Sequence, residues 1–236
     1  MVAYHQPVKR LLMERRDTVD LSRKSRKSGT SEFSTFEKGV LVLKQSNEPS
    51  WSVVTEGTED LNFAIYVACT YDLLPKSWPF SESKRWTSTN PSVDLTRTEK
   101  SVLSTQWLEW WNQLVRVRSL DEHNADLYRP TYFESMDQEL GHACRDTWQA
   151  FREWWHMPAG GNIAMIHWES AENVGQYVKE FEQRMNRKAR PFRLRVDLVY
   201  TGLDDLIEVT DEYVIMPIRS PRENQFWWTQ KINAIG

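Results

Sequence analysis

The stretch SMDQELGHACRDTWQAFREWWH, residues 135–156, carries the pattern on which the fold prediction depends. At 3.6 residues per turn, its apolar side chains fall on one side of a helix and its polar side chains fall largely on the other. The apolar side comprises Leu140, Cys144, Trp148, Phe151 and Trp155. Ser135 and Gln138 have the spacing of a capping box, and Pro158 with the glycines after it predicts the end of the helix. We therefore expect an amphipathic helix whose tryptophan-bearing face lies in the core.

A second helix with tryptophans on one face is predicted upstream. It begins after Thr96, with Glu99 at the T-x-x-E position of a capping box. Its apolar face comprises Leu103, Trp107, Trp110, Leu114 and Val117. Two long helices that are joined by a loop and that each carry such a face are expected to pack face to face in antiparallel orientation. The sequence thus predicts a Trp-rich helix pair.

Shorter periodic segments predict strands and further helices. Residues 58–74 combine helical spacing with strand-like composition, and we favour a helix there. Strands are predicted at residues 39–44, 51–56, 162–168, 192–200, 206–209 and 212–218, the first two as antiparallel neighbours. Ser170 is expected to cap a helix between the strands at 162–168 and 192–200, which would make a crossover unit. Pro217 favours an edge position for the last strand.

Together these elements predict an α+β fold for residues 36–236. We expect a mixed sheet of about five strands, covered on one side by three or four helices that include the Trp-rich pair. Residues 1–35 are rich in Ser, Thr and charged side chains, which cannot bury enough apolar surface to order the segment. We therefore predict a flexible arm followed by a single globular domain.

Charge is distributed unevenly along this chain of 236 residues, whose net charge is -3. Residues 1–29 hold eight cations and three acids, a net charge of +5, which leaves -8 for the remainder. The cations are Lys9, Arg10, Arg15, Arg16, Arg23, Lys24, Arg26 and Lys27. Spaced cations on a flexible segment suit the phosphates of nucleic acid or the headgroups of anionic lipids. The sequence predicts an anion-binding arm, and a solvated tail is the alternative.

The sequence shows no motif for a cofactor, a metal site or a catalytic set. Cys69 and Cys144 are too few for a disulfide framework, and no C-x-x-C or H-x-x-x-H pair is present to hold a transition metal. His142 and Cys144 are two positions apart on a predicted helix and cannot meet as base and nucleophile. With no signal peptide and no apolar stretch of membrane-spanning length, we expect an intracellular protein, cytoplasmic or nuclear.

Two candidate interaction sites occur near the end of the sequence. Three aromatic residues lie in a segment without a helical stripe, so we predict an exposed patch that binds a partner or a second copy of the chain. They are Phe226, Trp227 and Trp228. Acidic residues crowd the last predicted hairpin, where they could hold the basic arm, with a solvated edge as the alternative. They include Asp204, Asp205 and Glu208.

The functional hypothesis from sequence is a non-enzymatic structural or interaction protein whose arm contacts an anionic partner. The partner would be nucleic acid or an anionic membrane surface. A first alternative is a protein-binding module, such as an inhibitor or an immunity-type partner, that acts through the acidic body. A second alternative is an enzyme of unrecognised type, with His142, Arg145 and Asp146 on an exposed helix face near His123.

Overall fold

The computed structural model describes residues 40–41, 51–83, 86, 95–120 and 131–236. The predicted arm at residues 1–35 and the polar segment at 121–130 lie outside the described residues.

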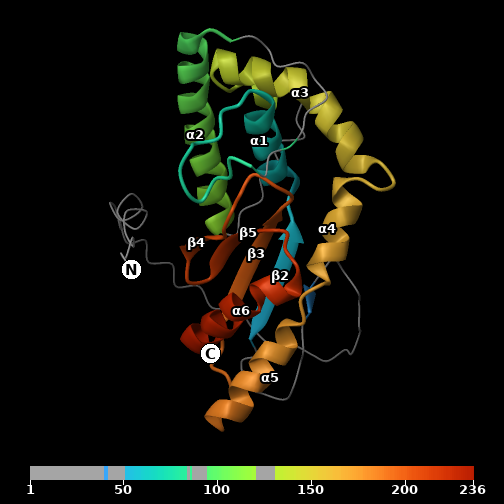
Figure 1. Ribbon diagram of the computed structural model, residues 1–236, viewed down its shortest axis with the longest axis vertical. Helices are drawn as coiled ribbons and strands as arrows, with labels where there is room; N and C mark the ends of the chain where they lie inside the picture. Colours follow the sequence, from blue (N-terminus) through green and yellow to red (C-terminus); the bar gives the residue numbers. More distant parts are fainter. Residues whose placement is uncertain (1–39, 42–50, 84–85, 87–94, 121–130) are drawn as a thin grey trace, which may run out of the picture. The chain divides into compact units, whose positions relative to one another are not determined.

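Five strands form one mixed sheet in the order β1-β2-β3-β5-β4 (Figure 1). β2, β3 and β5 are mutually parallel, whereas β1 and β4 run antiparallel to their neighbours. The strands are β1 (Val40–Leu41), β2 (Ser52–Gly57), β3 (Arg193–Val199), β4 (Ile207–Thr210) and β5 (Tyr213–Pro217). Only two residues of β1 are described, so four strands make up most of the described sheet, and the other residues of the predicted strand at 39–44 lie outside the described residues.

Most of the remaining described chain is helical. The helices are α1 (Glu59–Thr70), α2 (Arg97–Ser119), the 3-10 helix η3 (Tyr132–Glu134), α3 (Gln138–His156), α4 (Gly161–Glu169), α5 (Val174–Met185) and α6 (Pro221–Ile235). Among the helices that the structure describes, none has both the length and the apolar composition needed to cross a bilayer. The predicted α+β class and the aromatic-rich helices are confirmed.

Helices pack against both faces of the sheet, whereas the sequence predicted cover on one side. On one face, the Arg118 guanidinium of α2 donates to the Asp197 carboxylate of β3. On the other face, α4 packs so closely on β2 that a Cβ added to Gly57 would lie 2.2 Å from the Cβ of Met165. The physical reason is that residues 194–199 of β3 are buried on both sides, as is usual for a parallel strand.

Residues 162–168 belong to helix α4 rather than to the predicted strand. An apolar run of this length is compatible with either structure when periodicity is the only guide. The predicted crossover unit is therefore wrong, and in the described part of the connection between β2 and its parallel neighbour β3 the regular elements are helices. Ser170 ends α4 instead of capping the next helix. The cap of α5 is Asn173, whose side chain accepts from Gln176 N at 3.2 Å.

β5 is an inner strand, although Pro217 was taken to favour an edge. It lies between β3 and β4. Pro217 is the last residue of β5 and stands opposite Val199 of β3, beyond Ile215, where the pairing with β4 ends. The N–H of Ile218 then donates to Val199 O at 3.0 Å. The proline is accommodated because it follows the part of the strand that is paired on both sides.

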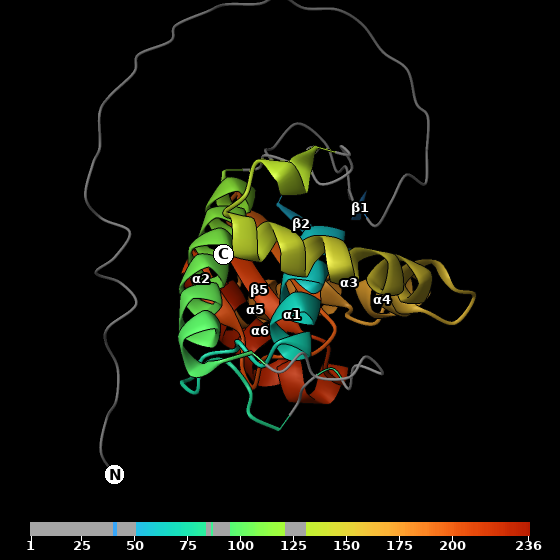
Figure 2. The same ribbon diagram turned by 90° about the horizontal axis from the view of Figure 1, so that it is seen from above.

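The tryptophan faces of α2 and α3 meet around α1 rather than only each other. The Phe63 ring of α1 lies 4.7 Å from Trp148, 5.1 Å from Phe151 and 6.0 Å from Trp110. The tryptophans of both faces are buried as predicted, Trp148 only in part. Figures 1 and 2 show that α3 crosses α2 instead of running antiparallel beside it. The sequence analysis predicted direct packing of α2 on α3 and did not predict that α1 lies between their tryptophan faces.

The two predicted capping boxes have different outcomes. At the start of α2, Glu99 N donates to Thr96 Oγ1 at 3.3 Å, and Thr96 N donates to the Glu99 carboxylate at 2.8 Å, as predicted. Ser135 instead ends the 3-10 helix, where its hydroxyl donates to Tyr132 O at 2.7 Å. Helix α3 starts after Asp137, so the predicted role of Ser135 is wrong.

Candidate functional site

The predicted site residues differ in what the structure can say of them. The eight arm cations and His123 lie outside the described residues. His142, Arg145 and Asp146 are exposed on α3, while Cys144 is fully buried. Burial raises the pKa of the Cys144 thiol above its ordinary range, so this group is a neutral core side chain. His142 and Cys144 therefore do not form a catalytic pair.

Helix α6 separates the three aromatic residues that were predicted to form a surface patch. Phe226 is 72% exposed, whereas Trp228 is 0% exposed. Trp227 is half-buried, and its Nε1 donates to the Glu208 carboxylate at 2.8 Å. The predicted patch of three exposed rings is therefore wrong. The S-P-R-E sequence at 220–223, which forms a capping box at the start of α6, was the signal of a helix in the sequence.

The acidic residues of the β4–β5 region already have partners within the described chain. The contacts join Ser81 Oγ to Asp204 (2.8 Å), Arg219 to Asp205 (3.2 Å) and Lys231 to Glu208 (3.1 Å). These hydrogen bonds and ion pairs occupy the carboxylates that were candidates for holding the basic arm. The structure thus offers no free carboxylate at these three positions to support that docking hypothesis.

A buried ionic cluster joins α1, α2 and the centre of the sheet. Arg118 Nη1 lies 3.2 Å from Asp60 Oδ2, and the Arg118 Nε donates to Asp197. The hydroxyl of Tyr213 also donates to Asp197, at 2.7 Å. Burial by itself would lower the pKa of Arg118, but Asp60 and Asp197 more than offset it, and the pKa is raised. Arg118 therefore remains charged in the interior.

The chemistry of this cluster is structural. Burial, followed by the charge of Asp197, raises the pKa of Tyr213 far above its ordinary value. The Tyr213 hydroxyl therefore keeps its proton near neutral pH and donates it in the hydrogen bond to Asp197. Arg195 lies over the Tyr213 ring at 4.8 Å and adds a second buried cation. Each charge faces an opposite charge or a donor, which is how buried ions avoid the cost of lost hydration.

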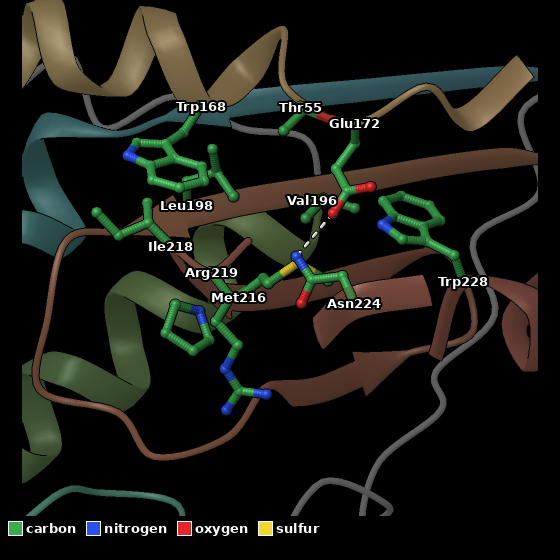
Figure 3. A pocket seen from close by; sticks show the side chains of 11 residues that line it. Thr55, Trp168, Glu172, Val196, Leu198, Met216, Ile218, Arg219, Asn224 and Trp228 are labelled. Atoms are coloured by element: carbon green, nitrogen blue, oxygen red, sulfur yellow. Dashed lines mark hydrogen bonds between the residues drawn. The ribbon is translucent and has the colours of Figure 1, made fainter. Parts of the chain in front are cut away.

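A cavity of about 10 Å³ lies between the α4–α5 junction, α6 and the sheet (Figure 3). Asn224 Nδ2 donates to the Glu172 carboxylate at 2.8 Å. Trp228 Nε1 faces the same carboxylate but completes no hydrogen bond with the described residues. The cavity volume corresponds to about one water molecule, too little for a substrate. In the described residues, no three His, Cys, Asp or Glu side chains are placed to hold a metal ion.

Glu172 provides a pH-dependent test of this site. Burial raises its pKa, and the polar groups of Asn224, Trp228 and Tyr177 that face the carboxylate only partly oppose the shift. When the pKa of a carboxyl group is higher in the folded than in the unfolded state, the folded protein loses stability as pH rises from the unfolded pKa of about 4.3 toward the raised value. Glutamine at position 172 does not titrate, so the Glu172→Gln variant avoids this loss. The melting temperature of the variant minus that of the unmodified protein should therefore increase over that pH interval. Melts followed by circular dichroism from pH 3.5 to 7 test this, and Glu180→Gln on the surface of α5 is the control. A difference that does not change with pH would contradict it.

A second basic segment lies within the described chain. Residues 184–193, RMNRKARPFR, run from the end of α5 to the first residue of β3 and contain five cations and no acid. All five are exposed, and we call them the basic corner: Arg184, Arg187, Lys188, Arg190 and Arg193. The sequence analysis assigned no function to this run, which lies at the end of the helix predicted before the strand at 192–200. Its charge count was the signal that could have identified it.

Local packing fixes the path of the basic corner. Asn186 adopts the left-handed conformation at φ 48° and ends α5, where Asn is tolerated better than most residues. The Arg187 guanidinium lies 4.9 Å over the Phe181 ring. Lys188 is 3.3 Å from Glu182, yet 74% of its side chain is exposed. The backbone of the corner is thus held by the fold. The Arg187 guanidinium also donates to Gly236 O at 2.9 Å, and all five basic residues remain exposed.

Comparisons of the chain with protein families, with curated proteins and with solved structures found no match.

Proposed function

We propose that this chain is a non-enzymatic binding protein that contacts the phosphate backbone of nucleic acid through the basic corner, together with the predicted arm. The observation that carries the proposal is the presence of five exposed cations and no acid in ten residues. The whole chain has a net charge of -3, and residues 1–29 and 184–193 contribute +5 each, so the remainder carries -13. Positive charge is concentrated in two segments, which favours binding of a polyanion there.

The residue types favour nucleic acid over a lipid surface. Four of the five cations are arginines, whose planar guanidinium groups bind phosphate oxygens through two parallel hydrogen bonds. A helix that lies in a membrane surface needs an exposed apolar face along its own length, opposite its charged face. On α5 the apolar residues Val178 and Phe181 are buried, and Met185 is the exposed apolar side chain of that helix. The corner therefore suits a phosphate backbone better than a bilayer.

Neutralising the corner should weaken binding in a salt-dependent way. The test variant replaces Lys188, Arg190 and Arg193 with glutamine. Each lost phosphate contact lowers the slope of log affinity against log salt by about 0.7 for a single strand. Three contacts therefore predict a slope smaller by about 2 and an affinity about 100-fold lower at 0.1 M salt. Fluorescence anisotropy of a labelled 20-nucleotide strand between 50 and 200 mM salt measures both quantities.

The matched control removes the same charge elsewhere on the described surface, by glutamine at Arg97, Arg116 and Arg222, all of which are exposed. We expect its affinity to stay within about threefold of the unmodified protein, because long-range charge effects are screened at this ionic strength. Equal losses in the two variants would show that binding follows net charge and would overturn the proposal. Preference for phosphatidylglycerol vesicles over the strand would assign the corner to membranes instead.

A further inference from the structure

We infer that the partner is single-stranded, and that its unpaired bases stack on a pair of aromatic rings, Trp51 and Phe192, beside the basic corner. This inference rests on the proposed function. Phe192 lies inside the basic segment, with Arg190 before it and Arg193 directly after it. The Trp51 and Phe192 rings lie nearly parallel, with centroids 5.9 Å apart and an interplanar angle of 13°. Cations thus flank an aromatic platform.

The sheet fixes this ring pair in place. Trp51 and Phe192 immediately precede the parallel strands β2 and β3, and Ser52 N donates to Phe192 O at 2.9 Å. Both rings pack in part against a small cluster that contains Phe181 and Ile232. Each residue is only partly buried, so part of its surface faces solvent. The platform is therefore rigid on its inner side and accessible on its outer side, so little order has to be gained on binding.

The combination distinguishes a single strand from other polyanions. In a duplex the faces of the bases are covered by their neighbours, and a protein reaches only the groove edges and the backbone. In a single strand each base offers a free face, and stacking on an aromatic side chain strengthens binding by about 5- to 150-fold per base. Arg187 and Arg193 are six residues apart, so their Cα atoms are separated by at most roughly 22 Å. That distance suits a short strand whose phosphates meet the cations while its bases meet the rings.

The experiment compares three probes on the full chain: single-stranded oligo(dT) of 20 nucleotides, a duplex of the same length, and inorganic polyphosphate of similar charge. We expect oligo(dT) to bind most tightly. Trp51→Leu should weaken oligo(dT) binding by at least about 5-fold and leave polyphosphate binding unchanged. Trp78→Leu is the matched control, because Trp78 is 65% exposed and lies outside the basic segment. It should alter neither.

Crosslinking of the unmodified protein tests the same inference without a substitution, so the result does not depend on whether the Trp51 variant folds. Oligonucleotides that contain 5-bromodeoxyuridine crosslink to aromatic side chains in contact with the base when irradiated. We expect the crosslinked peptides of the unmodified protein to contain Trp51 or Phe192. Crosslinks confined to other segments would overturn the inference.

The two proposals fail in different ways. If oligo(dT) and polyphosphate bind equally well and both require the basic corner, base stacking is wrong and phosphate binding stands. If the corner variant binds all three probes as well as the unmodified protein does, the proposed function itself is wrong. A duplex that binds more tightly than oligo(dT) would contradict the single-strand inference alone.

Discussion

Replacing Arg118 with alanine is expected to lower the free energy of unfolding by about 3–5 kcal/mol. The side chain is 5% exposed and pairs with Asp60 and Asp197, which are 5% and 0% exposed. Removing the cation leaves Asp60 in the interior without its buried counter-charge, while Asp197 keeps the more distant Arg195, at 3.8 Å, and the Tyr213 hydroxyl as a donor. Loss of one partner of a buried ion pair is among the most destabilising single changes because the remaining charge is not rehydrated.

Urea denaturation followed by circular dichroism measures this effect, provided that the slope with denaturant stays the same in the two proteins. Arg116→Ala is the matched control, because Arg116 is exposed on the same helix. An exposed position without buried partners is expected to change stability by less than about 0.5 kcal/mol. Equal, small losses in both variants would show that the Arg118 cluster is not needed for the fold.

The Arg118 cluster could not be predicted from the local sequence pattern. Position 118 follows Leu114 by four residues and continues the buried side of α2, so its burial was visible in the helical period. Its positive charge instead predicted that the side chain would be exposed to solvent. The partners that reverse this preference, Asp60 and Asp197, are 58 and 79 residues away. Only the tertiary arrangement brings them together, and a local pattern cannot supply it.

The elements that could be predicted are those whose signal is local. The helical stripes of α2 and α3 and the hairpin of β4 and β5 depend on nearby residues. The segment at 162–168 was misassigned because a buried helix and a buried strand share the same short apolar run. The basic corner was visible as a charge count in residues 184–193. The ring pair of Trp51 and Phe192 was not visible, because it depends on the parallel pairing of β2 with β3.

Replacing Trp228 with alanine is expected to lower the free energy of unfolding by about 3–5 kcal/mol, as is typical when a large buried aromatic is truncated. Trp228 is 0% exposed and stacks on Tyr177 of α5 at 6.2 Å with an interplanar angle of 9°. It also lines the cavity that holds Glu172, next to Val196 of β3. Its loss would therefore loosen the contact of α6 with both α5 and the sheet.

Phe226→Ala on the same helix is the internal comparison, since Phe226 is 72% exposed. Its loss should cost less than about 0.5 kcal/mol, measured in the same urea titrations. The sequence-based interpretation placed both rings in one exposed patch, which would give two small and similar losses. The structure requires a large difference between them, because one ring lies in the core and the other faces solvent. Two equal losses would mean that α6 does not pack through Trp228, and that the lining of the Glu172 cavity differs from the one described.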